Sequence, residues 1–396
     1  MAPTRAWAVL VSVLVACAAD PSDCKDGACP PATCPTEGFC GIDGLCVAAG
    51  VARSDDPCQA CVPSTSTGAW SLAPGCTDTF FASPEPGFAD GPLASARMRF
   101  PNAVWMAPDG AVYVSDTDNR RIRVIRDGTV GTHAGSGQEG RVDGPSEEVG
   151  FIYTSGITID DSTGDMYITD IGANSLRLIR DGVVTTLAGD LSGGYREGLL
   201  ADALFSFPLE IFFDDGRLYV IDTDNFRIRV VEDGVTRTIV GTGEMGFRDG
   251  PAEQALISDV RGFTVHDGKV YFADRGNARV RVLEDGVVRT IAGSGEPGTR
   301  DGPALQAQFI AVWDVAVMPD GRIYATDVGA DTVREISDGQ VRTIAGIPNQ
   351  TGFADGPGHQ AKFNDPFRIF AAPDGRLYIG DRENNRVRVV VPPTRQ

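Results

Sequence analysis

The chain has 396 residues, nine cysteines and a formal net charge of −19. A surface that acidic repels phosphate backbones and anionic lipid headgroups, so we expect no nucleic-acid partner. Length alone would suggest two or three domains. A repeated motif fills about four fifths of the chain, however, so the repeat decides the architecture instead.

The first sixteen residues have the features of an export signal. Arg5 precedes an apolar run from Ala6 to Ala16, which is about half the length needed to span a bilayer. Residues 1–16 are therefore predicted to be a signal peptide. Leu14-Val15-Ala16-Cys17 resembles the lipobox of bacterial lipoproteins, which implies lipidation of Cys17 as the only membrane attachment and a place in the cell envelope, with the outer membrane favoured. Ala16-Cys17-Ala18 also fits an ordinary cleavage site, which leaves a freely secreted protein as the alternative.

Residues 17–76 are predicted to form a small disulfide-rich segment. Eight further cysteines lie there, and none follows: Cys24, Cys29, Cys34, Cys40, Cys46, Cys58, Cys61 and Cys76. An even, closely spaced set in an exported chain indicates about four disulfides, whose pairing the sequence leaves open. Cys58 and Cys61 could also be a redox or zinc pair, but no histidine precedes His133, so disulfides are favoured. The segment resembles cysteine-rich modules of secreted myxobacterial proteins, which implies location more than activity.

The rest of the chain repeats one unit six times. In the first unit, strand-like runs cover residues 103–106, 112–115, 121–125 and 131–134, separated by Pro-Asp-Gly, Asp-Gly and Ala-Gly turns. An aspartate after an x-Tyr-x-x segment recurs every 52 to 54 residues, at Asp116, Asp170, Asp222, Asp274, Asp327 and Asp381. Four strands in each of six units predict an all-β, six-bladed propeller over residues 77–396.

The ends of the chain predict how the ring closes. The sixth unit stops after its third strand, near Val391, while residues 79–90 align without a gap on residues 290–301 and so supply a fourth strand. We therefore expect the N-terminal strand to complete the last blade, which removes the exposed sheet edges of an open array.

Units reading Asp-Gly-Pro, Pro-Asp-Gly, x-Tyr-x-x-Asp, Asn-x-Arg-Ile-Arg and Thr-Ile-Ala-Gly resemble NHL repeats over residues 77–396. The resemblance implies the six-bladed fold. It says less about function, because NHL propellers include scaffolds, sensor domains and a few enzymes.

Residues found in every unit are expected to hold the units together. Tyrosines such as Tyr113 should fill the space between blades. The aspartates should pair with arginines seven residues later, namely Arg123, Arg177, Arg229, Arg281, Arg334 and Arg388. The second and fifth units depart from the pattern, since Ser175 and Thr332 stand where Arg121 stands in the first.

Positions that differ between units carry more functional information. The start of the first strand of each unit should surround the mouth of the central channel, where most NHL units have glycine. Here these positions include charged and aromatic residues, and we predict a ligand-binding surface formed by Asn102, Glu210, Arg261, Trp313, Asp314, Phe367 and Arg368. Opposite charges with two aromatics suit a protein, peptide or glycan partner. The alternative is that the charges neutralise one another around a water-filled channel.

Some propellers resembling this one are enzymes, namely zinc-dependent peptidyl-amidoglycolate lyases and calcium-dependent lactonases of the gluconolactonase and paraoxonase group. The three histidines, His133, His266 and His359, are predicted on an outer strand, a turn and a loop, too far apart for one zinc ion. Asn102, Glu210 and Asp314 could offer oxygen ligands to calcium, but Arg261 and Arg368 oppose it. We therefore expect a monomeric binding or scaffold module without a cofactor, and keep the calcium lactonase or lyase as the alternative.

Overall fold

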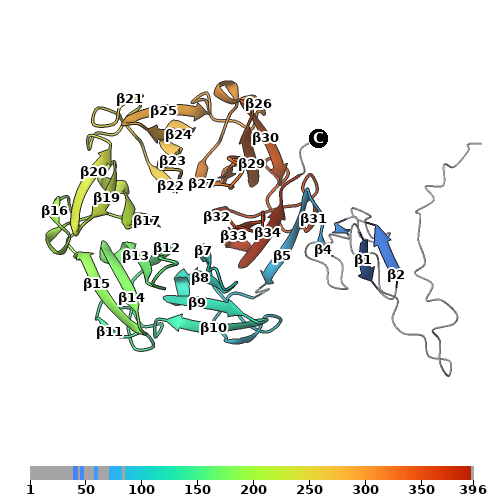
Figure 1. Cartoon of the computed structure of the whole chain (residues 1–396), viewed down its shortest axis with the longest axis horizontal. Helices are drawn as coiled ribbons and strands as arrows, with labels where there is room; N and C mark the ends of the chain where they lie inside the picture. The colour runs from blue at the N-terminus through green and yellow to red at the C-terminus, as the bar shows by residue number, and fades with distance from the viewer. Residues whose placement is uncertain (1–38, 43–44, 49–57, 61–70, 83–84, 394–396) are drawn as a thin grey trace, which may run out of the picture. The chain divides into compact units, whose positions relative to one another are not determined.

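The computed structural model describes residues 39–42, 45–48, 58–60, 71–82 and 85–393. The chain divides into two compact units, residues 1–76 and residues 77–396. In the larger unit, six antiparallel sheets are arranged as a ring around a central axis (Figure 1). The predicted all-β six-bladed propeller is therefore confirmed. Within the described residues, no helix has the length and apolar character needed to cross a membrane.

Each blade runs outward from the axis in chain order, because tight turns join its antiparallel strands. The first blade has β7 (Pro101–Met106), β8 (Val112–Asp116), β9 (Arg121–Arg126) and β10 (Thr129–Ala134). The second has β12 (Thr154–Ile159), β13 (Met166–Asp170), β14 (Ser175–Arg180) and β15 (Val183–Gly189). The third has β17 (Pro208–Asp214), β18 (Arg217–Asp222), β19 (Arg227–Glu232) and β20 (Val235–Val240).

The other three blades follow the same order. The fourth has β22 (Val260–His266), β23 (Lys269–Asp274), β24 (Arg279–Glu284) and β25 (Val287–Ala292). The fifth has β27 (Val312–Val317), β28 (Ile323–Asp327), β29 (Thr332–Ser337) and β30 (Gln340–Ala345). The sixth has β32 (Pro366–Ala371), β33 (Leu377–Asp381), β34 (Arg386–Val391) and, from the other end of the propeller, β5 (Cys76–Ala82).

The ring closes as predicted, because β5 takes the fourth place in the sixth sheet. The strand order there is β31-β5-β34-β33-β32, so the start of the propeller lies against its last strand (Figure 1). Phe81 of β5 is buried, and the ring of Phe80 meets that of Tyr378 edge-on at 5.2 Å. The closing strand is thus held by side-chain packing as well as by backbone hydrogen bonds to the strands on either side.

Each sheet has a fifth strand that the sequence did not predict. The Gly-Pro of the Asp-Gly-Pro turn, or Gly-Leu in one unit, pairs with the outermost long strand. These pairs are β6 (Gly91–Pro92), β11 (Gly144–Pro145), β16 (Gly198–Leu199), β21 (Gly250–Pro251), β26 (Gly302–Pro303) and β31 (Gly356–Pro357). A two-residue strand that ends in proline covers the outer edge of the sheet. Because the strand is short and proline has no backbone N–H, it gives another chain little to pair with.

Short 3₁₀ turns complete the repeat. Five follow the second strand of a blade: η2 (Thr117–Asn119), η3 (Ile171–Ala173), η5 (Thr223–Asn225), η6 (Arg275–Asn277) and η8 (Arg382–Asn384). Two more, η4 (Leu200–Asp202) and η7 (Ala304–Gln306), lie in the loops that enter the third and fifth blades.

The hydrophobic core lies between neighbouring blades. One cluster joins Tyr219, Ile221 and Val240 of the third blade to Phe263 and Phe272 of the fourth. Tyr167 in the second blade stacks on Phe213 of the third at 5.6 Å, as expected for the repeated tyrosines. Because each blade buries its two faces against the blades on either side, the ring stabilises every member of the array.

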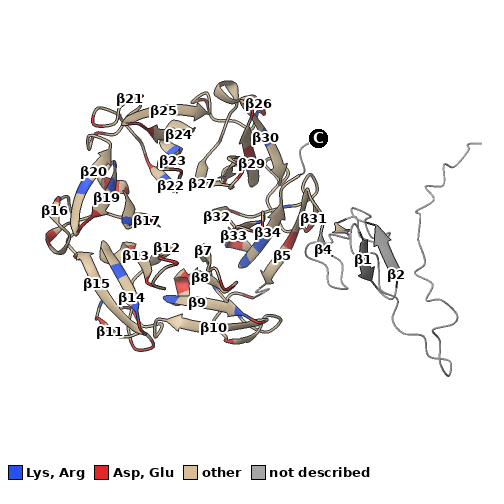
Figure 2. Ribbon diagram, viewed as in Figure 1, with Lys and Arg blue, Asp and Glu red and all other residues tan. Residues whose placement is uncertain are grey.

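The repeated arginine and aspartate form the predicted fastening. Arg123 on β9 is fully buried and donates to the Asp116 carboxylate at 2.8 Å and to the carbonyls of Arg97 and Ala89. It also pairs with Asp90 of the Asp-Gly-Pro turn. One guanidinium thus ties the second and third strands to the loop that enters the blade, and basic residues are visible on β9, β14 and β34 (Figure 2).

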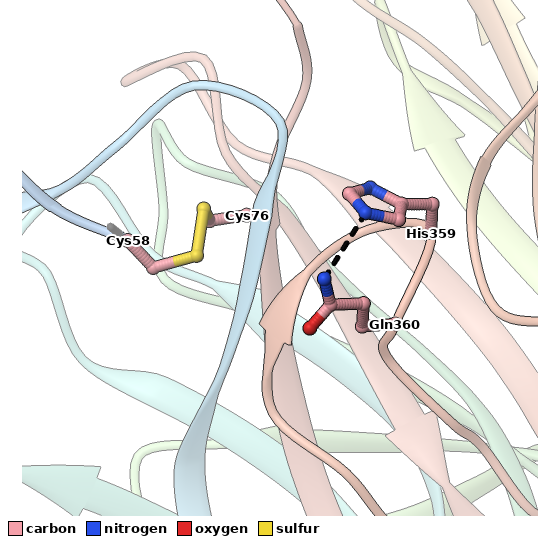
Figure 3. The surroundings of a disulfide bond; sticks show 4 residues. All are labelled: Cys58, Cys76, His359 and Gln360. Carbon is pink, nitrogen blue, oxygen red and sulfur yellow. Dashed lines mark hydrogen bonds between the residues drawn. A yellow bond between two sulfur atoms is a disulfide. The ribbon is translucent and has the colours of Figure 1, made fainter. Parts of the chain in front are cut away.

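The smaller unit is described in part. There β1 (Phe39–Ile42) pairs with β2 (Leu45–Ala48), and β3 (Gln59–Ala60) pairs with β4 (Ser71–Leu72). Cys58 forms a disulfide with Cys76, eighteen residues later (Figure 3). Cys58 is therefore a structural cysteine and not half of a redox pair with Cys61. Cys40 lies on β1 and Cys46 on β2; the predicted signal peptide, the lipidation at Cys17, and Cys24, Cys29, Cys34 and Cys61 lie outside the described residues.

Candidate functional site

Three charged side chains meet at the propeller axis. Glu210, Asp314 and Arg368 each occupy the third place of an inner strand, in β17, β27 and β32. Close to each of them the pairing with the second strand shifts register. Such a bulge re-aims the residues beside it. We call these three residues the axis cluster.

Arg368 is the hub of the axis cluster. Its Nη1 pairs with Glu210 Oε2 and lies 3.9 Å from Asp314 Oδ1. The guanidinium also donates to the carbonyl of Arg261 at 2.8 Å and to that of Leu209 at 3.3 Å. A longer bond of 3.4 Å reaches Ser155 Oγ. The sixth blade therefore contacts four others through one side chain.

Small residues in neighbouring blades make room for these charges. A Cβ on Gly156 would lie 2.7 Å from Glu210 Oε1, and a Cβ on Gly262 would lie 2.0 Å from Asp314 Oδ1. Real Cβ atoms do not approach oxygen that closely, so the glycines of the second and fourth blades are needed beside the acids of the third and fifth.

Burial sets the charge state of the axis cluster. Glu210, Asp314 and Arg368 are each less than a tenth exposed. Burial raises the pKa of Glu210 to about 8; Arg368 opposes the rise and the charge of Asp314 adds to it. Burial also raises the pKa of Asp314 to about 6, although Arg368 and the backbone N–H groups of Ile369 and Val315 lower it. Two carboxylates thus share one guanidinium, and in neutral solution Glu210 tends to keep a proton.

An aromatic pair precedes the axis cluster along two inner strands. The rings of Trp313 and Phe367 are 3.9 Å apart. The guanidinium carbons of Arg261 and Arg275 lie 5.1 and 5.5 Å from the Trp313 ring, within cation–π range. Asp259 pairs with both arginines. We call Arg261, Arg275, Trp313 and Phe367 the aromatic layer.

All seven predicted site residues lie around the axis, but most of them are covered. Asn102 is fully buried and donates to Ser155 Oγ at 3.4 Å, which links it to Arg368. Trp313 and Phe367 are also nearly covered, whereas Arg261 keeps about a fifth of its side chain exposed. A partner approaching this face would therefore meet the arginines of the aromatic layer before the rings or the acids.

A cavity of about 210 Å³ extends from the axis cluster along the central channel. Its walls come from residues that follow the cluster in the inner strands, including Trp105, Phe212, Phe263, Val317 and Phe370. Trp105 packs at 5.6 Å from Phe212 and 5.1 Å from Phe370. Sequence reasoning missed these aromatics, because it considered only the start of each inner strand. Their signal is present, since they stand two or three positions beyond the second residue of each strand.

The three histidines lie in three different units of the repeat, and one differs from its predicted place. His133 lies on β10 and His359 in a loop, where its Nε2 is 3.1 Å from the side-chain amide of Gln360 (Figure 3). His266 is the last residue of β22 instead of a turn residue, and it lines the channel cavity. Within the described residues, no group of three or more His, Cys, Asp or Glu residues could hold a metal ion. Of the oxygens considered for calcium, those of Glu210 and Asp314 face Arg368 instead.

Comparisons with known proteins support the repeat and the fold. No protein-family model matches the chain. It is 27% identical over 175 residues to the chloroplast protein Suppressor of Quenching 1 of Arabidopsis thaliana, which covers 40% of the chain and 17% of that protein. It is 25% identical over 284 residues to human NHL repeat-containing protein 2, covering 62% of the chain and 39% of that protein. The chain thus spans less than half the length of either relative.

Solved propellers are similar in shape. An auxiliary nutrient binding protein from Bacteroides thetaiotaomicron superposes with a TM-score of 0.61 at 15% identity, covering 87% of this chain and 85% of that one. One of the same description from Bacteroides ovatus gives a TM-score of 0.60 at 17% identity, covering 81% and 77%. At that identity the likeness shows the fold alone. The chain is thus similar to NHL-repeat proteins and has an NHL-type six-bladed propeller fold.

Proposed function

We propose that the protein is an exported binding or scaffold module, attached to the cell envelope through a lipid on Cys17, which binds a protein, peptide or glycan at the propeller axis. The observation that carries this proposal is the way Arg368 bridges the blades. Its contacts with Glu210, Asp314 and the carbonyls of Arg261 and Leu209 use the axis charges to make a rigid ring. A rigid, pre-organised surface binds with little loss of conformational freedom, which favours recognition.

The aromatic layer is the proposed contact surface. Arginine and tryptophan are the residue types that most often dominate binding energy. Arg261 and Arg275 keep about 21% and 37% of their side chains exposed beside Trp313, and Asp259 orients both. The solved propellers described as nutrient binding proteins show that this fold can serve a binding role.

Binding can be tested without knowing the partner in advance. A glycan array and a displayed peptide library should each be probed with the intact protein and with the variants Arg261→Ala and Arg275→Ala. We expect selected ligands to lose about tenfold or more in affinity in these variants. Arg342→Ala serves as the control, because Arg342 is exposed on β30, the outermost long strand of the fifth blade. Unchanged binding in both layer variants would remove the surface from consideration.

The envelope attachment has its own test. Mass spectrometry of the mature protein should show a lipid-modified Cys17 as the first residue. An unmodified N-terminus after residue 16 or 18 would mean that the protein is freely secreted. Either result leaves the binding proposal open to the array experiment.

A further inference from the structure

The channel cavity has a chemical character that neither the repeat nor the fold explains. Its walls are aromatic and aliphatic, with Trp105, Phe212, Phe263 and Phe370 among them, while one end is formed by Glu210, Asp314 and Arg368. An apolar cavity that ends in a buried charged group is suited to a ligand with an apolar body and one charged head. The sign of that head follows from the charges around the cavity.

When both of its carboxylates are ionised, the axis cluster lacks one positive charge, which a proton on Glu210 supplies in the absence of a ligand. Two carboxylates face a single guanidinium, and all three side chains are at least nine-tenths buried, so water compensates little of the excess negative charge. A monovalent cation in the cavity would supply that charge in place of the proton. A divalent metal ion would exceed it and would find aromatic walls in place of the six to eight oxygens that calcium prefers.

A neighbouring groove also favours a positively charged ligand. It shares Trp105, Phe212 and Val265 with the cavity wall, so the two adjoin. Its other side is lined by Asp160, Asp161, Asp214 and Asp215, and none of the described residues that line it is a lysine or arginine. The approach to the cavity is therefore acidic, which attracts cations and repels anions.

Resting on the proposed binding function, we infer that the channel cavity binds an organic ammonium group carried on an apolar or aromatic body. The ammonium would lie against Glu210 and Asp314, and the body would lie among Trp105, Phe212 and Phe370. Aromatic faces add cation–π attraction to the carboxylate contact. With room for about seven waters, the cavity admits a small amine or the N-terminal residue of a peptide, and both offer the same chemistry.

The charge state of Glu210 gives this inference a readout beyond affinity. Besides Glu210 of β17, the charged or titratable groups among the described residues that line the cavity are Asp314 of β27, Arg368 of β32 and His266 of β22; β7 and β12 contribute only uncharged side chains. Without a ligand, burial raises the pKa of Glu210, so the carboxyl holds a proton in neutral solution. A bound ammonium favours the ionised form, and binding should therefore release a proton and strengthen as the pH rises toward 8.5.

Calorimetry on the whole protein tests the inference with 2-phenylethylammonium, 2-phenylethanol and phenylacetate. Titration in two buffers of different protonation enthalpy should show that the amine binds, releases part of a proton at pH 7, and binds at least about tenfold more tightly than the alcohol or the acid. Equal binding of the alcohol would overturn the inference, since the cavity would then recognise only the apolar body.

Variants and peptides complete the experiment. Glu210→Gln should weaken amine binding about tenfold and abolish proton release. The control Glu232→Gln, at the end of β19 and outside the cavity lining, should change neither. Phe-Gly-Gly with a free N-terminus should compete with the amine if the natural source is a peptide, and its acetylated form should not compete. If neither amine nor peptide binds, the inference fails, while array binding through Arg261 and Arg275 would still uphold the proposed function.

Discussion

At the residue scale, four large aromatic side chains are exposed for a reason that the repeat makes visible. Phe88, Tyr195, Phe247 and Phe353 each keep more than two fifths of their surface in solvent. Each lies under the guanidinium of an arginine at the start of the third strand, at 3.8 to 4.0 Å, and under the buried arginine two residues later. In the second and fifth blades that first arginine is replaced by Ser175 or Thr332, and the aromatic position holds Arg141 or Thr299. The aromatics and arginines therefore vary together.

Removing one of these rings should have a modest, local effect. Phe247→Ala should lower the free energy of unfolding by about 1 kcal/mol, because Arg279 and Arg281 lose a cation–π partner. Thr299→Ala at the matching position of the fifth blade should change it by less than about 0.5 kcal/mol. Chemical denaturation of both variants checks the pair. Equal effects would show that the arginine stack contributes nothing.

The raised pKa of Glu210 predicts how stability depends on pH. A carboxyl whose pKa rises from 4.5 to about 8 on folding binds its proton more tightly in the folded state. The stabilisation of the folded state that Glu210 provides is fully present below pH 4.5 and is lost as the pH rises through about 8. The melting temperature of the protein should therefore fall more steeply over this range than that of Glu210→Gln. If the melting temperatures of the two proteins changed with pH in parallel, Glu210 would be ionised at the axis over this whole pH range.

At the element scale, the turns after the second strands exist in two forms. In four blades an asparagine such as Asn119 donates to the blade aspartate, here Asp116 at 2.8 Å, and to the carbonyl of Gly87. The residue before the inner strand is then left-handed in those blades, at Phe100, Phe207, Asp259 and Asp365. The second and fifth blades have alanine in place of the asparagine.

In the four asparagine blades the aspartate accepts from one backbone N–H, such as that of Arg99, whereas in the second and fifth blades a second backbone N–H replaces the asparagine. Asp327 accepts from the N–H groups of Ile310 and Ala311, and its distance to Arg334 grows to 3.7 Å. Gly329 fits because a Cβ there would lie 2.4 Å from Ile310 Cγ2. The departure of these units is thus a second way of satisfying the same aspartate.

The second form depends on its glycine. Gly329→Ala should cost about 1–3 kcal/mol of stability, because the added methyl overlaps the Ile310 side chain. Gly131→Ala on β10 is a suitable control, since its Cβ would lie 3.8 Å from the nearest atom, which is ordinary contact. Thermal unfolding of both variants measures the difference, and a neutral Gly329→Ala would contradict the steric account.

At the scale of the whole molecule, the repeat predicted the blades, the buried Arg–Asp fastenings and the closing strand, because each recurs in register or aligns end to end. The axis was harder to predict. Position alone brought Glu210, Asp314 and Arg368 together, but their burial depends on Gly156 and Gly262 in other blades, and such contacts appear only when the ring is closed. The aromatic channel wall was missed for the same reason.

Ring closure should be measurable by truncation. A chain that starts at Thr77 keeps most of β5, whereas one that starts after Ala82 loses it together with the buried Phe81. The shorter chain should melt at least about 5 °C lower, because a large buried side chain is lost and the β34 edge is exposed. Equal melting temperatures would show that the ring does not need this strand.

The axis cluster is the feature on which both the rigid ring and the proposed ligand site depend, and a double-mutant cycle tests it most directly. Denaturation of the protein, of Glu210→Gln, of Arg368→Gln and of the double variant gives the energy of coupling between the two side chains. We predict a coupling of about 1–3 kcal/mol, as expected for residues in one buried network. Effects that add to within about 0.5 kcal/mol would contradict the account, because Glu210 and Arg368 would then not be in contact at the axis.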